Sequence, residues 1–263
     1  MELTGWLGGV VASAIAALGT AAGALVLFLR RRWSGHQQVL MLASAAGVML
    51  GATVFSLLLP ALDAFSETLG GPGGAGMTAL WVLLGSGSIG VLNQLVPHEH
   101  ARKGREGPAS LLGRHTLFVL AIALHNFPEG LSVGVASGVE LSKGLPLLLG
   151  ITAQNLPEGF AVAAALLNDG ARRGLAVGVG ALTGLAEVVG GMVGASAVSV
   201  GAAVVPYAFA FAAGAMLFVI SGEVIPETHA GGREAAAPHA LMVGCAAMMV
   251  LTVVLGCERG VAG

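Results

Sequence analysis

Hydrophobic stretches of about 20 residues recur along the chain, and each is long enough to cross a lipid bilayer as a helix. We expect eight such spans, at residues 5–29, 38–62, 75–97, 115–137, 145–167, 174–198, 202–225 and 238–257. Only 10% of the 263 residues are charged, against about 25% in a soluble domain, so polar side chains are too few to cover a water-exposed globule. The sequence therefore predicts an all-α integral membrane protein, with residues 1–263 forming a single transmembrane domain.

Ten of the 12 lysine and arginine residues fall on one side of an eight-span arrangement. They follow the first, third, fifth and seventh spans, whereas only Lys143 and Arg259 fall on the other side. Because short basic loops stay in the cytoplasm, this split predicts a multi-pass protein with both termini on the extracytoplasmic side. The longest polar connection, about 98–114, is then cytoplasmic, and we expect residues 70–74 to form a flexible turn on the opposite side.

Glu129, Glu158 and Glu187 lie inside the predicted spans, and Glu223 lies near the end of another. A charge at the middle of a bilayer costs roughly 2.5–3.5 kcal/mol on insertion scales, and no lysine or arginine occurs inside a predicted span. Either these carboxyl groups are protonated, or a cation from outside the chain binds among them. Ionisable residues inside a membrane are candidates for a functional site.

Two of the glutamates belong to matching motifs, His125-Asn126-Phe127-Pro128-Glu129-Gly130 and Gln154-Asn155-Leu156-Pro157-Glu158-Gly159. At 100° per residue, the first, second and fifth positions of each motif share a 100° arc of the helix, and the short link between the two spans lets these faces meet. Each proline frees a backbone carbonyl, which a membrane helix tolerates where it lines a cavity or binds an ion. One imidazole, two carboxylates and three amides suit Zn²⁺, Fe²⁺, Mn²⁺, Co²⁺ or Cd²⁺. Glutamates from both helices can bridge two such ions, with Glu187 closing one side.

The paired motifs resemble the core motifs of the ZIP family of zinc and iron transporters, particularly its bacterial GufA-like branch. The resemblance extends to residues 51–60, residues 97–100, Glu187 and residues 223–229. It implies eight helices in a 3+2+3 inverted-repeat bundle, with spans 1–3 and 6–8 arranged around the central spans 4 and 5. It also implies a transporter, not an enzyme, that carries Zn²⁺ as its substrate across the bacterial inner membrane into the cytoplasm by alternating access.

The resemblance further implies a binuclear metal centre. One ion would contact His125, Glu129, Gln154 and Glu158, and the second would contact Asn126, Glu129, Asn155, Glu158 and Glu187. Met49 is expected near the first ion, Ser56 at the outer entrance, and Glu223 and His229 at the inner exit. Three positions depart from the family's pattern: Asn155 stands where aspartate is common, which lowers the charge of the second site, Gly222 replaces a histidine, and Asn93 replaces an acidic residue.

Other functions remain open at this point. A proton channel, or a proton-coupled transporter of an organic solute, would use the same carboxylates without metal. An intramembrane metalloprotease is disfavoured because the sequence contains no His-Glu-x-x-His motif. A purely structural metal site is a further possibility, although two proline-kinked helices with freed carbonyls favour transit of an ion. The expected partners are divalent metal ions and the lipid bilayer, with no nucleic acid, and the small-residue helix faces are compatible with a homodimer.

Overall fold

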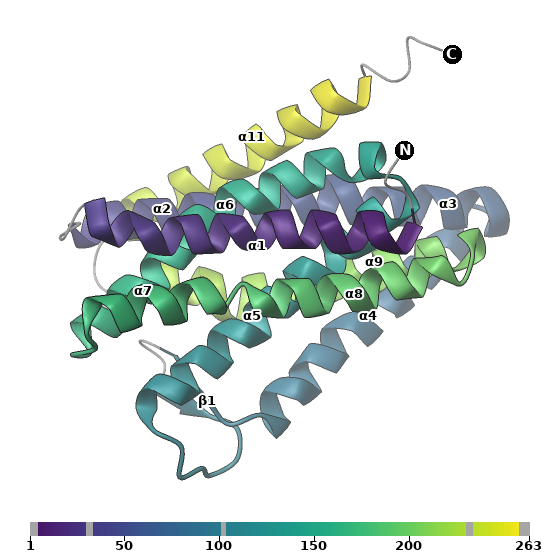
Figure 1. The fold of residues 1–263 in the computed structure, drawn as a ribbon. Helices are drawn as coiled ribbons and strands as arrows, with labels where there is room; N and C mark the ends of the chain where they lie inside the picture. The colour runs from purple at the N-terminus through teal and green to yellow at the C-terminus, as the bar shows by residue number, and fades with distance from the viewer. Residues whose placement is uncertain (1–4, 30–33, 101–103, 230–233, 258–263) are drawn as a thin grey trace.

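The computed structural model describes residues 5–29, 34–100, 104–229 and 234–257, which form a bundle of long helices with a small hairpin beside it (Figure 1). The helix that starts the chain, α1, begins at the same end of the bundle at which α11 ends. In chain order the elements are α1 (Gly5–Leu29), α2 (Gly35–Ala52), η1 (Thr53–Leu58), α3 (Leu59–Leu69), α4 (Gly71–Leu95), β1 (His98–His100), β2 (Gly104–Glu106), α5 (Arg114–Val139), α6 (Leu141–Asn168), α7 (Arg173–Leu182), α8 (Leu185–Ser199), η2 (Ala202–Val204), α9 (Val205–Val219), η3 (Ile220–Val224), α10 (Ile225–His229), η4 (Glu234–Ala236) and α11 (Ala237–Cys257).

Seven helical segments of the described chain, some of them joined end to end, are long and apolar enough to cross a membrane. They cover residues 5–29, 35–69, 71–95, 116–139, 173–199, 202–224 and 237–255. The remaining predicted span, 145–167, falls on α6. This helix has 28 residues and is about 42 Å long at 1.5 Å per residue, but Gln154, Asn155 and Glu158 lower its hydropathy. A multi-pass helical membrane protein is confirmed. That residues 145–167 also cross the membrane, which would make eight spans in all, stays a prediction.

The flexible turn predicted at residues 70–74 is wrong. Only Gly70 leaves helical geometry, with φ 75° and ψ 163°, and α4 begins at the next residue. Pro72 lies in the first turn of α4, where its missing N–H costs no helical hydrogen bond. A Cβ added to Gly74 would lie 2.5 Å from Ser66 Oγ. The link between α3 and α4 is therefore a tight helical hairpin, and the second span extends seven residues beyond its predicted end.

Three spans contain interruptions. In the numbering of the eight predicted spans, the π-helical segments η1 and η3 interrupt the second and seventh. A proline lies two residues after the end of each segment, Pro60 after η1 and Pro226 after η3. Proline crowds the carbonyl four residues earlier and cannot donate to it, and π-helical turns often occur at functional sites. The sixth span is divided between α7 and α8 at Thr183 and Gly184.

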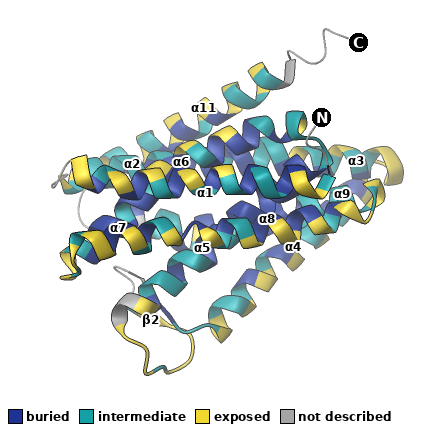
Figure 2. Ribbon diagram, in the orientation of Figure 1, coloured by how far each residue is buried: buried dark blue, intermediate teal, exposed yellow. Residues whose placement is uncertain are grey.

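Glycines allow two groups of helices to pack with their backbones almost in contact. In the first group, Gly23 of α1 faces α6 and Gly134 of α5 faces α8; in the second, Gly47 of α2 faces α11 and Gly85 of α4 faces α9. A Cβ at any of these four positions would lie within 2.3 Å of the opposing backbone. A cluster of apolar side chains lies between the groups, with members from α1, α2, η1, α4, α5, α6, α9, η3 and α11. Figure 2 shows that buried residues lie inside the bundle, whereas α11 is mostly exposed or half-buried.

The predicted polar loop at 98–114 contains an antiparallel hairpin, in which β1 pairs His98 with Glu106 and Glu99 with Arg105 of β2. The His98 side chain is fully buried, and its Nδ1 lies 2.7 Å from the Val96 carbonyl oxygen. Strands of three residues are too short for a period of two to be recognised in the sequence, so this hairpin was not predicted. It lies at the end of the bundle where α5 begins.

Candidate functional site

The two polar motifs lie in the middle of α5 and α6, and both helices continue through the inner prolines. A single residue, Glu140, separates the two helices, so they run in opposite directions and bring the motifs to a similar depth. Glu158 is half-buried, and the other five polar side chains of the motifs are buried: His125, Asn126, Glu129, Gln154 and Asn155. The structure thus concentrates polar groups in the interior of an otherwise apolar bundle.

Glu187 lies in the first turn of α8 and accepts hydrogen bonds from three other helices. Thr20 Oγ1 of α1 donates to Glu187 Oε1 over 2.5 Å, and Asn126 Nδ2 of α5 donates to the same oxygen over 3.3 Å. Asn155 Nδ2 of α6 donates to Glu187 Oε2 over 2.6 Å. The carboxylate is fully buried, and both of its oxygens are hydrogen-bonded.

Glu129 has the opposite surroundings. It is fully buried, yet in the described part of the chain neither carboxylate oxygen has a hydrogen-bond partner of normal geometry. The side-chain oxygens of Asn126 and Gln154 are unpartnered in the same sense. Buried acceptors normally have partners, and oxygens that lack donors are suitable ligands for a divalent cation. Glu129 and Gln154 also line one cavity, so their oxygens offer acceptors that a cation there would complete.

His125 connects this region to the seventh span. Its Nδ1 lies 2.7 Å from the Ala121 carbonyl oxygen, so that nitrogen donates. Its Nε2 lies 2.6 Å from Oε2 of Glu223 in η3, and Asn93 Nδ2 of α4 donates to the other oxygen of Glu223 over 2.7 Å. Glu223 was expected only at the inner exit, but the structure places it in direct contact with His125.

The buried polar side chains of the two motifs, together with Glu187, form a polar layer inside the bundle. A cavity of about 90 Å³ leads away from this polar layer. His125, Glu129, Gln154 and Glu158 line its inner part, together with Met49 of α2. Its lining continues along α5, α6 and α10, through Phe118, Ile122, Ala161, Val162, Ala165 and Thr228. Phe118 precedes Glu129 by 11 residues, about 16 Å along a helix. The cavity therefore extends toward the end of the bundle where α2 and α5 begin.

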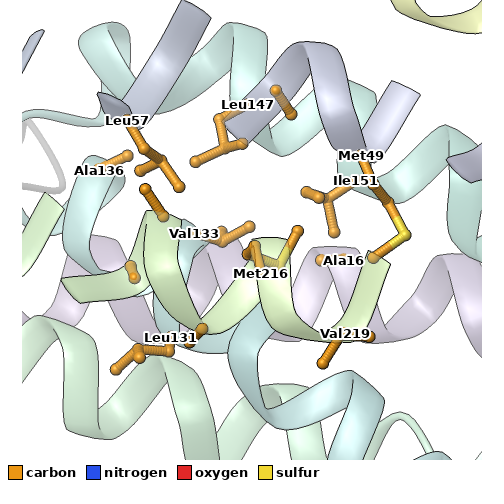
Figure 3. Packing of buried hydrophobic residues seen from close by; sticks show 14 of the residues in the cluster. Ala16, Met49, Leu57, Leu131, Val133, Ala136, Leu147, Ile151, Met216 and Val219 are labelled. Carbon is orange, nitrogen blue, oxygen red and sulfur yellow. The ribbon is translucent and has the colours of Figure 1, made fainter. Parts of the chain in front are cut away.

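On the other side of the polar layer, apolar side chains close the bundle. Val133 follows Glu129 by one helical turn on α5, and Ile151 and Leu147 precede Gln154 by one and two turns on α6; all three are fully buried. Leu57 of η1 and Met216 of α9 gather with them (Figure 3). A cavity therefore adjoins the polar layer on one side, and packed apolar side chains close the bundle on the other.

The final glycine of each motif brings a further helix to the site. A Cβ on Gly130 would lie 1.8 Å from the carbonyl oxygen of Glu187, and a Cβ on Gly159 would lie 1.9 Å from the carbonyl oxygen of Thr20. Only glycine leaves room for such close backbone approach. The glycines therefore let α8 and α1 present Glu187 and Thr20 to the polar layer.

The remaining predicted residues are distributed unevenly. Met49 is buried and lines the cavity, whereas Ser56 lies in the other half of the bundle, where its Oγ is 3.4 Å from Thr252 Oγ1. His229 ends α10, and its side chain lies outside the described residues. Among the residues described, no three His, Cys, Asp or Glu side chains are grouped so that they could hold a metal ion. Because His125 is bonded to Glu223, it would have to leave that contact before it could bind an ion together with Glu129.

Thr20 was not identified from the sequence. Its hydroxyl is fully buried in α1 and bonds the Glu187 carboxylate. The available signal is its spacing, because Ser13 and Thr20 are seven residues apart and therefore lie on one face of α1. Ser13 Oγ also faces the centre, at 3.2 Å from the Gly130 carbonyl oxygen. Isolated hydroxyl groups on the small-residue face of an apolar helix are therefore candidate site residues, as buried carboxylates are.

The chain resembles several known proteins. A family model described as ZIP Zinc transporter matches residues 93–252. The chain is 43% identical over 251 residues to Zinc transporter GufA of Myxococcus xanthus, an alignment that covers 94% of this chain and 99% of that protein. It is 46% identical over 241 residues to Zinc transporter ZIPB of Bordetella bronchiseptica, covering 90% of this chain and 78% of the relative. Identity to Zinc transporter ZIP11 of Homo sapiens is 31% over 326 residues, covering 90% and 94%.

Proposed function

The chain belongs to the ZIP family of zinc transporters, and we propose on that premise that it carries Zn²⁺ across the membrane through the polar layer between α5, α6 and α8. The ion would bind first at Glu129, Gln154 and Glu158, with His125 joining when it leaves Glu223. The related ions Cd²⁺, Fe²⁺, Mn²⁺ and Co²⁺ prefer similar nitrogen and oxygen ligands. The protein acts as a carrier and not as an enzyme.

The observation that carries this proposal is the condition of Glu129. Its carboxylate is fully buried inside a membrane helix and has no hydrogen-bond donor of normal geometry among the described residues. No lysine or arginine lies inside any of the eight predicted spans, and the His125 imidazole is engaged by Glu223, so neither kind of side chain is paired with Glu129. A divalent cation bound beside Glu129 would satisfy both the charge and the unpartnered oxygens.

The position of the cavity supports movement toward the cytoplasm. It extends from Glu129 toward the end of the bundle at which α2 and α5 begin, while packed side chains such as Val133 and Ile151 close the opposite side. The structure thus fits an inward-facing state of an alternating-access cycle. The two glycine-packed helix groups are natural rigid bodies for the motion, because the interface between them is made largely of apolar side chains that can slide past one another.

The topology that we propose has eight spans, with α6 as the fifth, both termini outside the cytoplasm, and the whole chain as one transport domain in the bacterial inner membrane. Helix packing supports the inverted repeat. The third span packs on the seventh as the eighth packs on the second, and the first packs on the fifth as the sixth packs on the fourth. No observation favours the alternative of proton movement without metal, and the relatives named above are all described as zinc transporters.

Zn²⁺ flux into vesicles that contain a metal-sensitive dye would test the proposal. Removing a residue that only orients a metal ligand commonly costs about 10–100-fold in affinity, and removing a ligand itself should cost at least as much. We therefore expect Glu129→Gln and Glu158→Gln to lower flux by at least about tenfold. Glu67→Gln is the matched control, because it makes the same change on an exposed position of α3. Wild-type flux in Glu129→Gln would eliminate the proposed site.

A further inference from the structure

We infer that the position around Glu187 holds no second metal ion, and that a hydrogen-bond network of Thr20, Asn126 and Asn155 takes its place. This inference rests on the proposed function, since it concerns how many ions the carrier binds. It departs from the binuclear centre implied by the resemblance. The carrier would hold one ion, at Glu129, and Glu187 would serve as a positioning residue.

The orientation of the two amides carries the inference. Asn155 Nδ2 donates both to Glu187 Oε2, over 2.6 Å, and to the Ala16 carbonyl oxygen, over 3.1 Å. Asn126 Nδ2 faces two acceptors in the same way, Glu187 Oε1 and the Thr183 carbonyl oxygen, each at 3.3 Å. Reversing either amide would place its oxygen against two other acceptors. Both asparagines are therefore fixed with their NH₂ groups toward the carboxylate.

An amide NH₂ group cannot bind a metal ion, because its nitrogen offers hydrogens and no free electron pair. The oxygen of Asn155 is also engaged, since Gln154 Nε2 donates to it over 2.6 Å. A second ion near Glu187 would find donors where it needs acceptors. The break between α7 and α8 contributes to this arrangement, because the Thr183 carbonyl oxygen at the break accepts from Asn126 Nδ2 as well as from the backbone N–H of Ala186 in α8.

The carboxyl group of Glu187 already has hydrogen-bond partners without a cation. Three donors surround the carboxylate, and it lies in the first turn of α8, a helix of 15 residues, where the helix dipole favours a negative charge. Glu129 has neither of these advantages, since its oxygens lack donors of normal geometry in the described structure and it lies in the middle of α5. An arriving cation would therefore bind at Glu129 and leave the Glu187 network intact.

Counting bound ions tests this inference. The full chain would be purified in detergent, saturated with Zn²⁺, separated from free ion by gel filtration and analysed by elemental mass spectrometry. We expect about one ion per chain in the wild type and about two in Asn155→Asp, because the new carboxylate replaces a donor with acceptor oxygens beside Glu187. Asn168→Asp is the matched control, since it adds the same charge at the exposed end of α6, and it should bind one ion.

Two ions in the wild type would overturn the inference, and this count does not depend on any variant folding. One ion in both the wild type and Asn155→Asp would also overturn it, because the amide of Asn155 would then not be what excludes the second ion. Flux measured on the same preparations keeps the two proposals apart. If flux requires Glu129 but the wild type binds two ions, the transport proposal stands and only the single-ion inference fails.

Discussion

Replacing Gly130 by alanine should displace Glu187 and remove most Zn²⁺ transport. A Cβ at position 130 would lie 1.8 Å from the Glu187 carbonyl oxygen, 2.4 Å from its carbonyl carbon and 2.5 Å from its Cα. These are all backbone atoms, so no side-chain rotation relieves the contact. Real Cβ atoms essentially never approach other atoms within 3.0 Å, and α8 must therefore retreat by more than about 1 Å.

The expected size of the effect follows from this displacement. Overpacking at a buried contact costs about 1–3 kcal/mol, and each kcal/mol lowers the melting temperature of a protein of this size by roughly 2–4 °C. A retreat of 1 Å also lengthens the bonds to Glu187 from Thr20, now 2.5 Å, and from Asn155, now 2.6 Å, beyond good hydrogen-bond distance. Misplacing a functional group by about 1 Å can cost about 100-fold in rate, and we expect a comparable loss of flux.

Thermal unfolding in detergent and dye-based Zn²⁺ flux would measure both effects on the same protein. Gly178→Ala in α7 is the control, because nothing lies within 4 Å of a Cβ at that exposed position. Alanine is favoured over glycine in a helix by about 0.5–1 kcal/mol, so this variant should keep its flux and melt at the same temperature or slightly higher. Wild-type stability and flux in Gly130→Ala would refute the close approach of α5 and α8.

Two further predictions concern the network and the cavity. Thr20→Val keeps the shape of the side chain but leaves Glu187 without one donor, and it should cost about 1–3 kcal/mol in thermal unfolding together with a loss of flux; no change in either would contradict a positioning role. In a chain whose native cysteines are replaced by serine, Ala165→Cys should react with a membrane-impermeant maleimide from the cytoplasmic side and be protected by Zn²⁺, because Ala165 lines the cavity. Ala136→Cys, inside the apolar cluster, should stay unlabelled, and equal labelling of both would argue against an inward-facing state.

The sequence predicted the helices well because a membrane span requires a long apolar stretch, and that requirement is visible without any knowledge of the fold. It failed where short polar or small residues decide the local structure. Residues 70–74 are rich in glycine and suggested a flexible turn, yet Pro72 lies in the first turn of α4 and Gly74 packs against Ser66. The hairpin at 98–106 depends on pairing between two strands of three residues, which leaves no periodic pattern to recognise.

For the candidate site, too, some features could be predicted from the sequence and others could not. Helical spacing within α5 placed Asn126 and Glu129 in the interior, and both are fully buried. Contacts between helices were harder to foresee, because they depend on crossing positions. The bond between His125 and Glu223 joins residues almost 100 positions apart, and it arises where η3 interrupts the seventh span. No spacing rule within a single segment predicts such a contact.

Thr20 and Glu187 explain why the two halves of the site have different chemistry despite equivalent packing. Each residue is approached by the final glycine of a motif, Gly159 or Gly130, from the fifth or the fourth span. In the proposed inverted repeat the first and sixth spans are partners, so Thr20 and Glu187 occupy corresponding places, and they hydrogen-bond each other over 2.5 Å. Two ionised glutamates at this distance would repel one another, so that one would be protonated or a cation would lie between them. A threonine instead supplies a donor, which lets the packing remain symmetrical while the need for a metal ion is confined to Glu129.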